Sequence, residues 1–306
     1  MTAASVNGLT IEYDVHGDES GEPLLLVMGL GCQLGNWPLD FVERLVAKGF
    51  RVIRFDNRDI GLSTKMNEPA PSRGRVIAAT LSRRFAKSSY RIEDMADDAA
   101  GLLSHLKIDK AHIVGVSMGG MISQSIAIRH PEQVASLTSI MSNTGDRRNG
   151  MISTKVMRKG PKLLKPNPAD PVTNAVELVR LISGPHFDEQ ATRAEVIAAQ
   201  ARQDDTEGTS RQTMAIAASP DRTQLLGNVK VPALVIHGLV DPLVKPSGGI
   251  ATAKAIPGSR LVMYPDMGHD LPRPRWDQVI EEIVDNARRA SKPATADTGG
   301  GAVVAV

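Results

Sequence analysis

The stretch His112-Ile113-Val114-Gly115-Val116-Ser117-Met118-Gly119-Gly120 joins a short apolar run to a segment with helical periodicity. The apolar run predicts a buried strand, and the apolar residues from Met121 to Ala127 recur at helical spacing until Pro131 ends the pattern. Between the two lies Gly-x-Ser-x-Gly, with Ser117 at its centre. A sharp strand-to-helix turn of this kind exposes the serine oxygen, and the small glycines permit the strained backbone. The first N–H groups of the helix remain free to stabilise a developing negative charge.

Similar apolar runs alternate with helical patterns along most of the chain. The runs are short and rich in Val, Ile and Leu, and they cover residues 23–28, 51–55, 112–115, 137–141 and 233–237. Helical stripes lie between them, as in Ile92–Leu106, and after them in Trp276–Val284. Strands that alternate with helices form parallel β-α-β units, and strands buried on both faces read as continuous apolar runs. We therefore expect an α/β fold whose mostly parallel sheet is covered by helices on both faces.

The alternation stops between residues 143 and 221, where helical patterns continue but no convincing strand is present. This predicts a helical insertion that lies over the C-terminal edge of the sheet. The expected organisation is a core built from residues 1–142 and 222–290, interrupted by the insertion at 143–221. The last residues, 291–306, are small and rich in glycine, which predicts a flexible tail.

A serine hydroxyl is a weak nucleophile unless a base accepts its proton and an acid orients the base. Asp241 follows the predicted strand 233–237, and His269 lies in a loop after the apolar run 261–263. Parallel sheets place their catalytic groups at the C-terminal ends of the strands. The chain order Ser117, Asp241, His269 therefore predicts a triad of nucleophile, orienting acid and base.

Two alternatives remain open for the triad. His237 ends the strand that precedes Asp241 and is the rival base, although packing or a local hydrogen bond is more typical of a strand histidine. Asp266 and Asp270 flank His269 and are the rival acids, with solvated loop carboxylates as the simpler interpretation.

The loop Met28-Gly29-Leu30-Gly31 closes the first strongly apolar strand. A glycine-rich loop at this place can aim a backbone N–H at the oxygen of a tetrahedral intermediate. We expect the N–H groups of Leu30 and Met118 to form the oxyanion hole. A tight turn without a catalytic role is the alternative for this loop. Cys32, close by, is expected to pack and not to react.

These motifs resemble those of the α/β-hydrolase superfamily, in particular bacterial esterases of the aclacinomycin methylesterase-like and haloperoxidase-like groups. The similarity spans about Leu24 to Ala287 and rests on five stretches, MGLG (28–31), FDNRDIGLST (55–64), GVSMGG (115–120), HGLVDPLV (237–244) and MGHD (267–270). The resemblance implies that the insertion is a helical cap and that residues 56–59 form a structural loop that shapes the site. Many members carry His-Gly where this chain has Met28-Gly29, so it lacks a side chain that often braces the oxyanion loop.

A serine at the turn favours acyl transfer through a covalent ester, whereas the superfamily's relatives that open haloalkanes or epoxides use aspartate there. We therefore expect hydrolysis of a carboxylic ester, a small hydrophobic molecule, with no cofactor and no metal. Hydrolysis of thioesters, phospholipids or carbon–carbon bonds and cofactor-free perhydrolysis remain open, because the same triad catalyses all of them. A ligand-binding receptor that keeps the triad and scarcely turns over is the alternative outside enzymes.

Composition and charge exclude several classes of protein. The 306 residues carry a net charge of +2, too balanced to suggest a nucleic-acid partner. No apolar run approaches the ~18 residues of a membrane-spanning helix. The single cysteine excludes an internal disulfide and a multi-cysteine zinc site. The first residues lack the basic and apolar regions of a secretory signal, so we expect a cytoplasmic protein, of an oligomeric state that the sequence does not indicate.

Two segments, 69–92 and 147–168, are basic and contain no acidic residue. If both border the site, they would attract an anionic substrate or an anionic lipid surface. The alternative is a solvated surface whose charge is balanced by acidic residues elsewhere in the chain.

Overall fold

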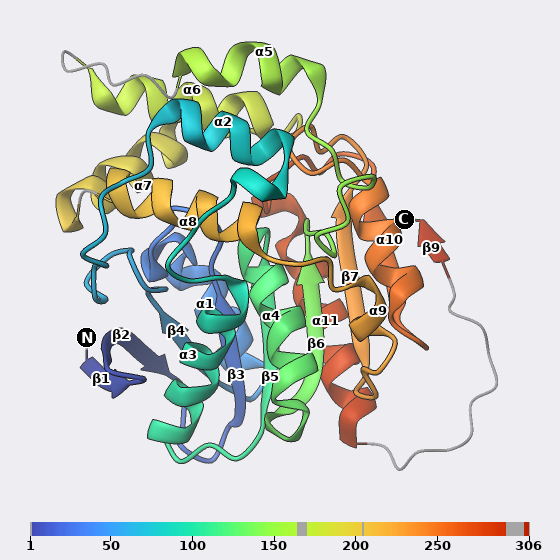
Figure 1. Cartoon of the computed structure of the whole chain (residues 1–306). Coiled ribbons are helices and arrows are strands. Elements are labelled where there is room, and N and C mark those ends of the chain that lie inside the picture. Colours follow the sequence, from blue (N-terminus) through green and yellow to red (C-terminus); the bar gives the residue numbers. More distant parts are fainter. Residues whose placement is uncertain (1, 164–169, 204, 292–302, 306) are drawn as a thin grey trace.

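The computed structural model describes residues 2–163, 170–203, 205–291 and 303–305 (Figure 1). The strands in these residues are β1 (Thr2–Val6), β2 (Leu9–His16), β3 (Glu22–Val27), β4 (Phe50–Phe55), β5 (Ala111–Val116), β6 (Val134–Ile140), β7 (Ala233–Gly238), β8 (Arg260–Tyr264) and β9 (Val303–Ala305). They form one sheet in the order β1-β2-β4-β3-β5-β6-β7-β8-β9. β2 pairs antiparallel with both β1 and β4, and the pairs from β4 to β9 are all parallel.

The helices lie between these strands in the chain. The α-helices of the described residues are α1 (Leu39–Ala47), α2 (Arg73–Leu81), α3 (Ile92–His105), α4 (Met118–Arg129), α5 (Thr154–Leu163), α6 (Pro171–Ile182), α7 (Glu189–Arg202), α8 (Thr206–Ala218), α9 (Thr223–Leu226), α10 (Ser247–Ala255) and α11 (Trp276–Ser291). Single turns of 3₁₀ helix are η1 (Leu34–Asn36), η2 (Arg83–Phe85), η3 (Pro131–Gln133) and η4 (Arg273–Arg275). Among the described helices, none combines the length with the apolar content that a membrane span requires.

Helices cover both faces of the sheet, as the alternation of side chains along β3 shows. Leu25 and Val27 belong to an apolar cluster with α3 and α4, whereas Leu24 and Leu26 point to the opposite face and pack with α1 and α11. All four side chains are buried. A strand that is buried on both faces needs apolar residues at every position, which explains the continuous apolar run. The predicted fold, a mostly parallel sheet covered by helices on both faces, is confirmed.

The segment between β6 and β7 is helical. Residues 143–203 and 205–221 contain α5, α6, α7 and α8 and, within the described part of the chain, no strand. Figure 1 shows these helices beyond the end of the sheet to which β6 and β7 point. α2, from a different part of the chain, packs against α8. Of the predicted tail 291–306, Ser291 ends α11, residues 303–305 form β9 beside β8, and the others lie outside the described residues.

Candidate active site

Ser117 lies in the turn between β5 and α4. Its backbone φ of 55° is in the left-handed region, which residues other than glycine rarely adopt. Its N–H donates to the carbonyl of Ile140 over 2.9 Å, and its carbonyl accepts from the Ser142 hydroxyl over 2.8 Å. Both partners lie at or just after the end of the neighbouring strand β6. These bonds hold the strained backbone that a sharp strand-to-helix turn requires.

The two glycines of the serine motif are needed because main chain passes close to both. A Cβ atom at Gly119 would clash with the carbonyl oxygen of Val27, on β3. A Cβ atom at Gly115 would clash with the carbonyl oxygen of Gly119 itself. The strand and the helix therefore approach this closely only with glycine at both positions.

Ser117, Asp241 and His269 meet at the carboxyl edge of the sheet. Asp241 follows β7 and His269 follows β8. The Nε2 atom of His269 lies 2.9 Å from the Ser117 Oγ, and its Nδ1 atom lies 2.8 Å from the Asp241 Oδ2. Because an ionised carboxylate only accepts hydrogen bonds, Nδ1 carries the proton and Nε2 is left to accept from the serine hydroxyl.

Asp241 is buried, and both of its carboxylate oxygens accept hydrogen bonds. Oδ1 accepts from the backbone N–H groups of Leu243 and Val244, each over 2.9 Å, and Oδ2 accepts from His269. Burial raises the pKa of this carboxyl, but hydrogen bonds from His237 and His269 outweigh that effect and lower the pKa to about 2. Asp241 is therefore ionised at neutral pH, as an acid that orients a histidine must be.

His237, the rival base, lies beside the acid and not beside the serine. Its side chain is fully buried on β7, with Nε2 2.7 Å from the carbonyl oxygen of Val244 and 3.4 Å from Asp241 Oδ2. A carbonyl oxygen only accepts, so Nε2 carries the proton. The geometry therefore favours His269 as the base and gives His237 a supporting place next to Asp241.

The rival acids have partners elsewhere. Asp266 pairs with Arg275 over 2.9 Å and with His186 over 2.7 Å. Asp270 accepts a hydrogen bond from the N–H of Gly268 over 2.8 Å and so stabilises its own loop. Neither carboxylate lies in the place of Asp241 beside His269 Nδ1, but both are partly buried and have protein partners, so they are not simply solvated.

The loop that carries His269 is held by the end of α6. The His269 N–H donates to the carbonyl of Ile182 over 2.8 Å, and Asp270 also accepts from the N–H of Gly184 over 3.2 Å. A Cβ atom at Gly268 would clash with the backbone of this segment. The insertion therefore touches the main chain of the candidate base directly, which no local sequence pattern indicates.

Of the two residues expected to form the oxyanion hole, Met118 follows Ser117 in the chain, and Leu30 belongs to a loop that approaches Ser117. Met118 is the first residue of α4. Leu30 follows Gly29, which packs against the serine, because a Cβ atom at Gly29 would lie 3.3 Å from the Ser117 Cβ. The approach of this loop to the serine is the arrangement that a pair of oxyanion donors requires.

Comparison with known proteins identifies the family to which the chain belongs. A family model described as the alpha/beta hydrolase fold matches residues 22–272, which is most of the chain. The chain belongs to the α/β-hydrolase family. The predicted membership of the α/β-hydrolase superfamily is thereby confirmed.

This α/β hydrolase has relatives that match it over nearly its whole length. Rhodomycin D methylesterase DnrP of Streptomyces peucetius is 29% identical over 301 residues, which cover 90% of this chain and 94% of the relative. The putative non-heme bromoperoxidase BpoC of Mycobacterium tuberculosis is 25% identical over 278 residues, covering 85% and 91%. Among solved structures, the enol-lactonase of Burkholderia xenovorans LB400 superposes with a TM-score of 0.72 at 25% identity, over 94% of this chain and 100% of that one.

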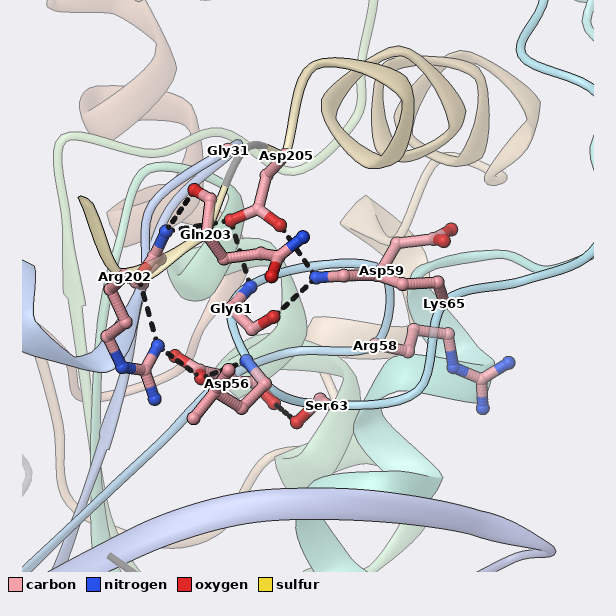
Figure 2. A network of polar contacts seen from close by, with 12 residues as sticks. Gly31, Asp56, Arg58, Asp59, Gly61, Ser63, Lys65, Arg202, Gln203 and Asp205 are labelled. Atoms are coloured by element: carbon pink, nitrogen blue, oxygen red, sulfur yellow. Dashed lines mark hydrogen bonds and ion pairs between the residues drawn. The ribbon is translucent and has the colours of Figure 1, made fainter. Parts of the chain in front are cut away.

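A buried polar network joins the loop after β4 of this α/β hydrolase to its insertion (Figure 2). Asp56, which is completely buried, pairs with Arg202 of α7 over 2.7 Å. Asp205, just before α8, accepts from the N–H of Gly61 over 2.9 Å and pairs with Lys65 over 2.6 Å. The loop that the family resemblance describes as structural therefore also holds α7 and α8 in place.

Cys32 lies just after the candidate oxyanion loop. Burial, reinforced by the negative charge of Glu195, raises the pKa of its thiol to about 11. The thiol is therefore protonated at neutral pH and lacks the thiolate that acts as a nucleophile. This agrees with a packing role and leaves Ser117 as the candidate nucleophile.

Proposed function

We propose that this α/β hydrolase is a serine esterase that cleaves carboxylic esters through an acyl-enzyme intermediate. The observation that carries the proposal is the line of contacts from Ser117 Oγ through His269 to Asp241, at 2.9 and 2.8 Å. The names of the similar methylesterase and enol-lactonase support an ester as the substrate. We expect the ester to be a small hydrophobic molecule.

Acylation begins when the Ser117 Oγ attacks the carbonyl carbon of the ester and His269 Nε2 accepts the hydroxyl proton. The negative charge that develops on the carbonyl oxygen is stabilised by the N–H groups of Met118 and Leu30. The bond to the alcohol then breaks, and the alcohol leaves with the proton that His269 returns. Asp241 stabilises the positive charge that His269 carries in between.

Deacylation repeats these steps with water. His269 Nε2 accepts a proton from a water molecule, whose oxygen attacks the acyl carbon. The bond to the Ser117 oxygen breaks, the serine regains its proton from His269, and the free acid is released. The catalytic groups of this cycle all belong to the chain and its reactants are the ester and water, so the proposed mechanism uses neither a cofactor nor a metal.

We assign to the insertion, residues 143–221, the role of a cap over this site. The hydrogen bond between the His269 N–H and the carbonyl of Ile182 supports this role, because it places the end of α6 against the base. A cap of this kind excludes bulk water and strengthens the electrostatic interactions inside the site.

A series of p-nitrophenyl esters from acetate to long acyl chains tests catalysis and chain preference together. We expect Ser117→Ala to lower kcat/KM by at least about 10⁴-fold, because the nucleophile is lost. Ser125→Ala is the matched control. The Ser125 hydroxyl is buried in α4 and has no hydrogen-bond partner among the described residues. A fluorophosphonate should label Ser117 in the wild type. Wild-type activity in Ser117→Ala, or a label on another residue, would falsify the proposal.

Thioester and phospholipid substrates in the same assay separate an esterase from hydrolases that use the same triad on other bonds. We expect kcat/KM for the best carboxylic ester to exceed that for a thioester with the same acyl group. A burst of product followed by negligible turnover would instead identify a ligand-binding receptor.

A further inference from the structure

Gln212 of α8 joins the candidate oxyanion loop to the loop after β4. Its Oε1 accepts from the N–H of Gly31 over 3.0 Å, and its Nε2 donates to the carbonyl of Arg58 over 3.0 Å. The side chain is completely buried. Because one partner is an N–H and the other a carbonyl, only one orientation of the amide satisfies both. Loss of this amide would remove the partner of a buried carbonyl, that of Arg58, and of a partly buried N–H, that of Gly31.

The oxyanion loop is also fixed at its other end. The Nδ2 of Asn57, a buried side chain, donates to the carbonyl of Met28 over 3.1 Å. Leu30, which carries the proposed oxyanion donor, lies between Met28 and Gly31. Two buried amides therefore hold the main chain on either side of Leu30, and the direction of its N–H depends on both.

α8 is anchored close to Gln212. Arg211, the preceding residue, pairs with the completely buried Asp59 over 2.8 Å. Thr209, one turn earlier, lies directly over the loop, because a Cβ atom at Gly31 would lie 2.7 Å from the Thr209 Oγ1. The position of the oxyanion loop is therefore set by a helix of the insertion as well as by the core.

We propose that Gln212 is a positioning residue for the oxyanion hole, and that the insertion contributes to catalysis through it. The inference rests on the proposed esterase function. Gln212 acts at a distance from the substrate: it keeps the Leu30 N–H aimed at the oxygen on which negative charge develops. Such donors stabilise a transition state only when they are already in place, and a misplacement of about 1 Å costs up to about 10²-fold in rate.

Gln212→Met tests this role, because it keeps the length and burial of the side chain and removes both hydrogen bonds. We expect kcat with a p-nitrophenyl ester to fall about 10- to 100-fold while KM changes less than about threefold, since ground-state binding makes little use of the donor. The affinity for a trifluoromethyl ketone, which forms an oxyanion on the serine, should fall by the same factor as kcat/KM. If Gln212 only stabilised the fold, kcat/KM and the affinity for the ketone would not fall by the same factor.

Lys65→Met is the matched control. It breaks the ion pair with Asp205, just before α8, without contact to the oxyanion loop. It should lower the melting temperature and leave kcat and ketone affinity unchanged. If Gln212→Met fails to fold, Gln212→Glu takes its place: it offers both hydrogen bonds only when protonated, so its kcat relative to wild type should rise as the pH falls.

The outcomes separate this inference from the proposed function. If Ser117→Ala is inactive while Gln212→Met keeps wild-type kcat and ketone affinity, the positioning role is wrong and the esterase mechanism stands. Wild-type activity in Ser117→Ala would overturn the proposed function itself, whatever the result for Gln212→Met. An equal loss of ketone affinity in Lys65→Met would assign the effect to a general loosening of α8, and that result would also overturn the inference.

Discussion

Two imidazoles approach the same oxygen of Asp241, His269 at 2.8 Å and His237 at 3.4 Å. His237 also donates to the carbonyl of Val244, so its proton is shared between a carbonyl and the carboxylate. Asp241 thus receives hydrogen bonds from side chains and from the backbone and donates none. This is the physical reason why its pKa lies near 2 in spite of burial, which acts in the opposite direction.

The lowered pKa of Asp241 predicts a pH-dependent contribution to stability. Its value is about 2 in the folded protein against 3.8 as reference for the unfolded chain, so the ionised group stabilises the fold fully above pH ~4 and less as the pH falls toward 2. Asp241→Asn removes this titration. We expect the free energy of unfolding in urea to differ between the wild type and the variant. The wild type's advantage should be about 2 kcal/mol larger at pH 6 than near pH 2. A difference that does not change between pH 6 and pH 3 would contradict the assignment.

The residues of the candidate site differ in how well the sequence predicts them. Ser117, Asp241 and His269 each follow a strand, and their chain order matches a known pattern, so local signals are enough to single them out. Gln212 has no such signal. Its partner Gly31 lies 181 positions away, and only the folded chain shows that an α8 amide meets this loop.

Among the helices and strands, the sequence best predicts those whose residue pattern is set by a buried face within a short stretch of chain. The five predicted strands agree with β3, β4, β5, β6 and β7 to within three residues at each end. The helical stripe Ile92–Leu106 becomes α3, and Trp276–Val284 forms the first part of α11. In each case a buried face imposes an apolar pattern along a short stretch of chain, and the pattern is readable without knowledge of the partner.

α2 shows where such reading fails. β2 is different, because Leu9–His16 alternates apolar and polar residues along its whole length, which is the pattern of a half-buried strand. α2, Arg73–Leu81, has little apolar periodicity, and its packing partner is α8, more than 100 residues later in the chain. Tertiary contacts, and not local propensity, stabilise such elements.

The turn at Ser117 provides a test of element packing. Gly119→Ala places a methyl group against the carbonyl oxygen of Val27, which forces α4 away from β3. We expect a loss of at least about 2 kcal/mol in the free energy of unfolding, measured by urea denaturation. Gly74→Ala is the control: this glycine of α2 has open space around its Cβ position, so alanine should stabilise by about 0.5–1 kcal/mol. Equal stability of the two variants would contradict the packing argument.

Over the whole molecule, charge is distributed unevenly. Residues 69–92 and 147–168 hold 13 of the 36 basic residues and none of the 34 acidic ones. The rest of the chain therefore holds 23 basic and 34 acidic residues, a net charge of −11. These segments include α2 and α5, which Figure 1 shows at the end of the molecule where the insertion lies. On α5, the exposed Lys155, Arg158 and Lys159 follow the spacing of a single helix face. We therefore expect a positive potential over α2 and α5, although the insertion as a whole, residues 143–221, holds 11 basic and 10 acidic residues.

We expect this potential to favour anionic esters over neutral ones. For a p-nitrophenyl ester with a carboxylate in its acyl chain, kcat/KM should fall several-fold between about 20 and 300 mM NaCl, because salt screens the attraction. A neutral ester of the same length should respond little. Lys155→Gln, Arg158→Gln and Lys159→Gln in one variant should flatten the response, whereas Lys48→Gln with Lys254→Gln, outside both segments, should not. Equal salt responses of the two esters would mean that the basic segments are solvated surface only.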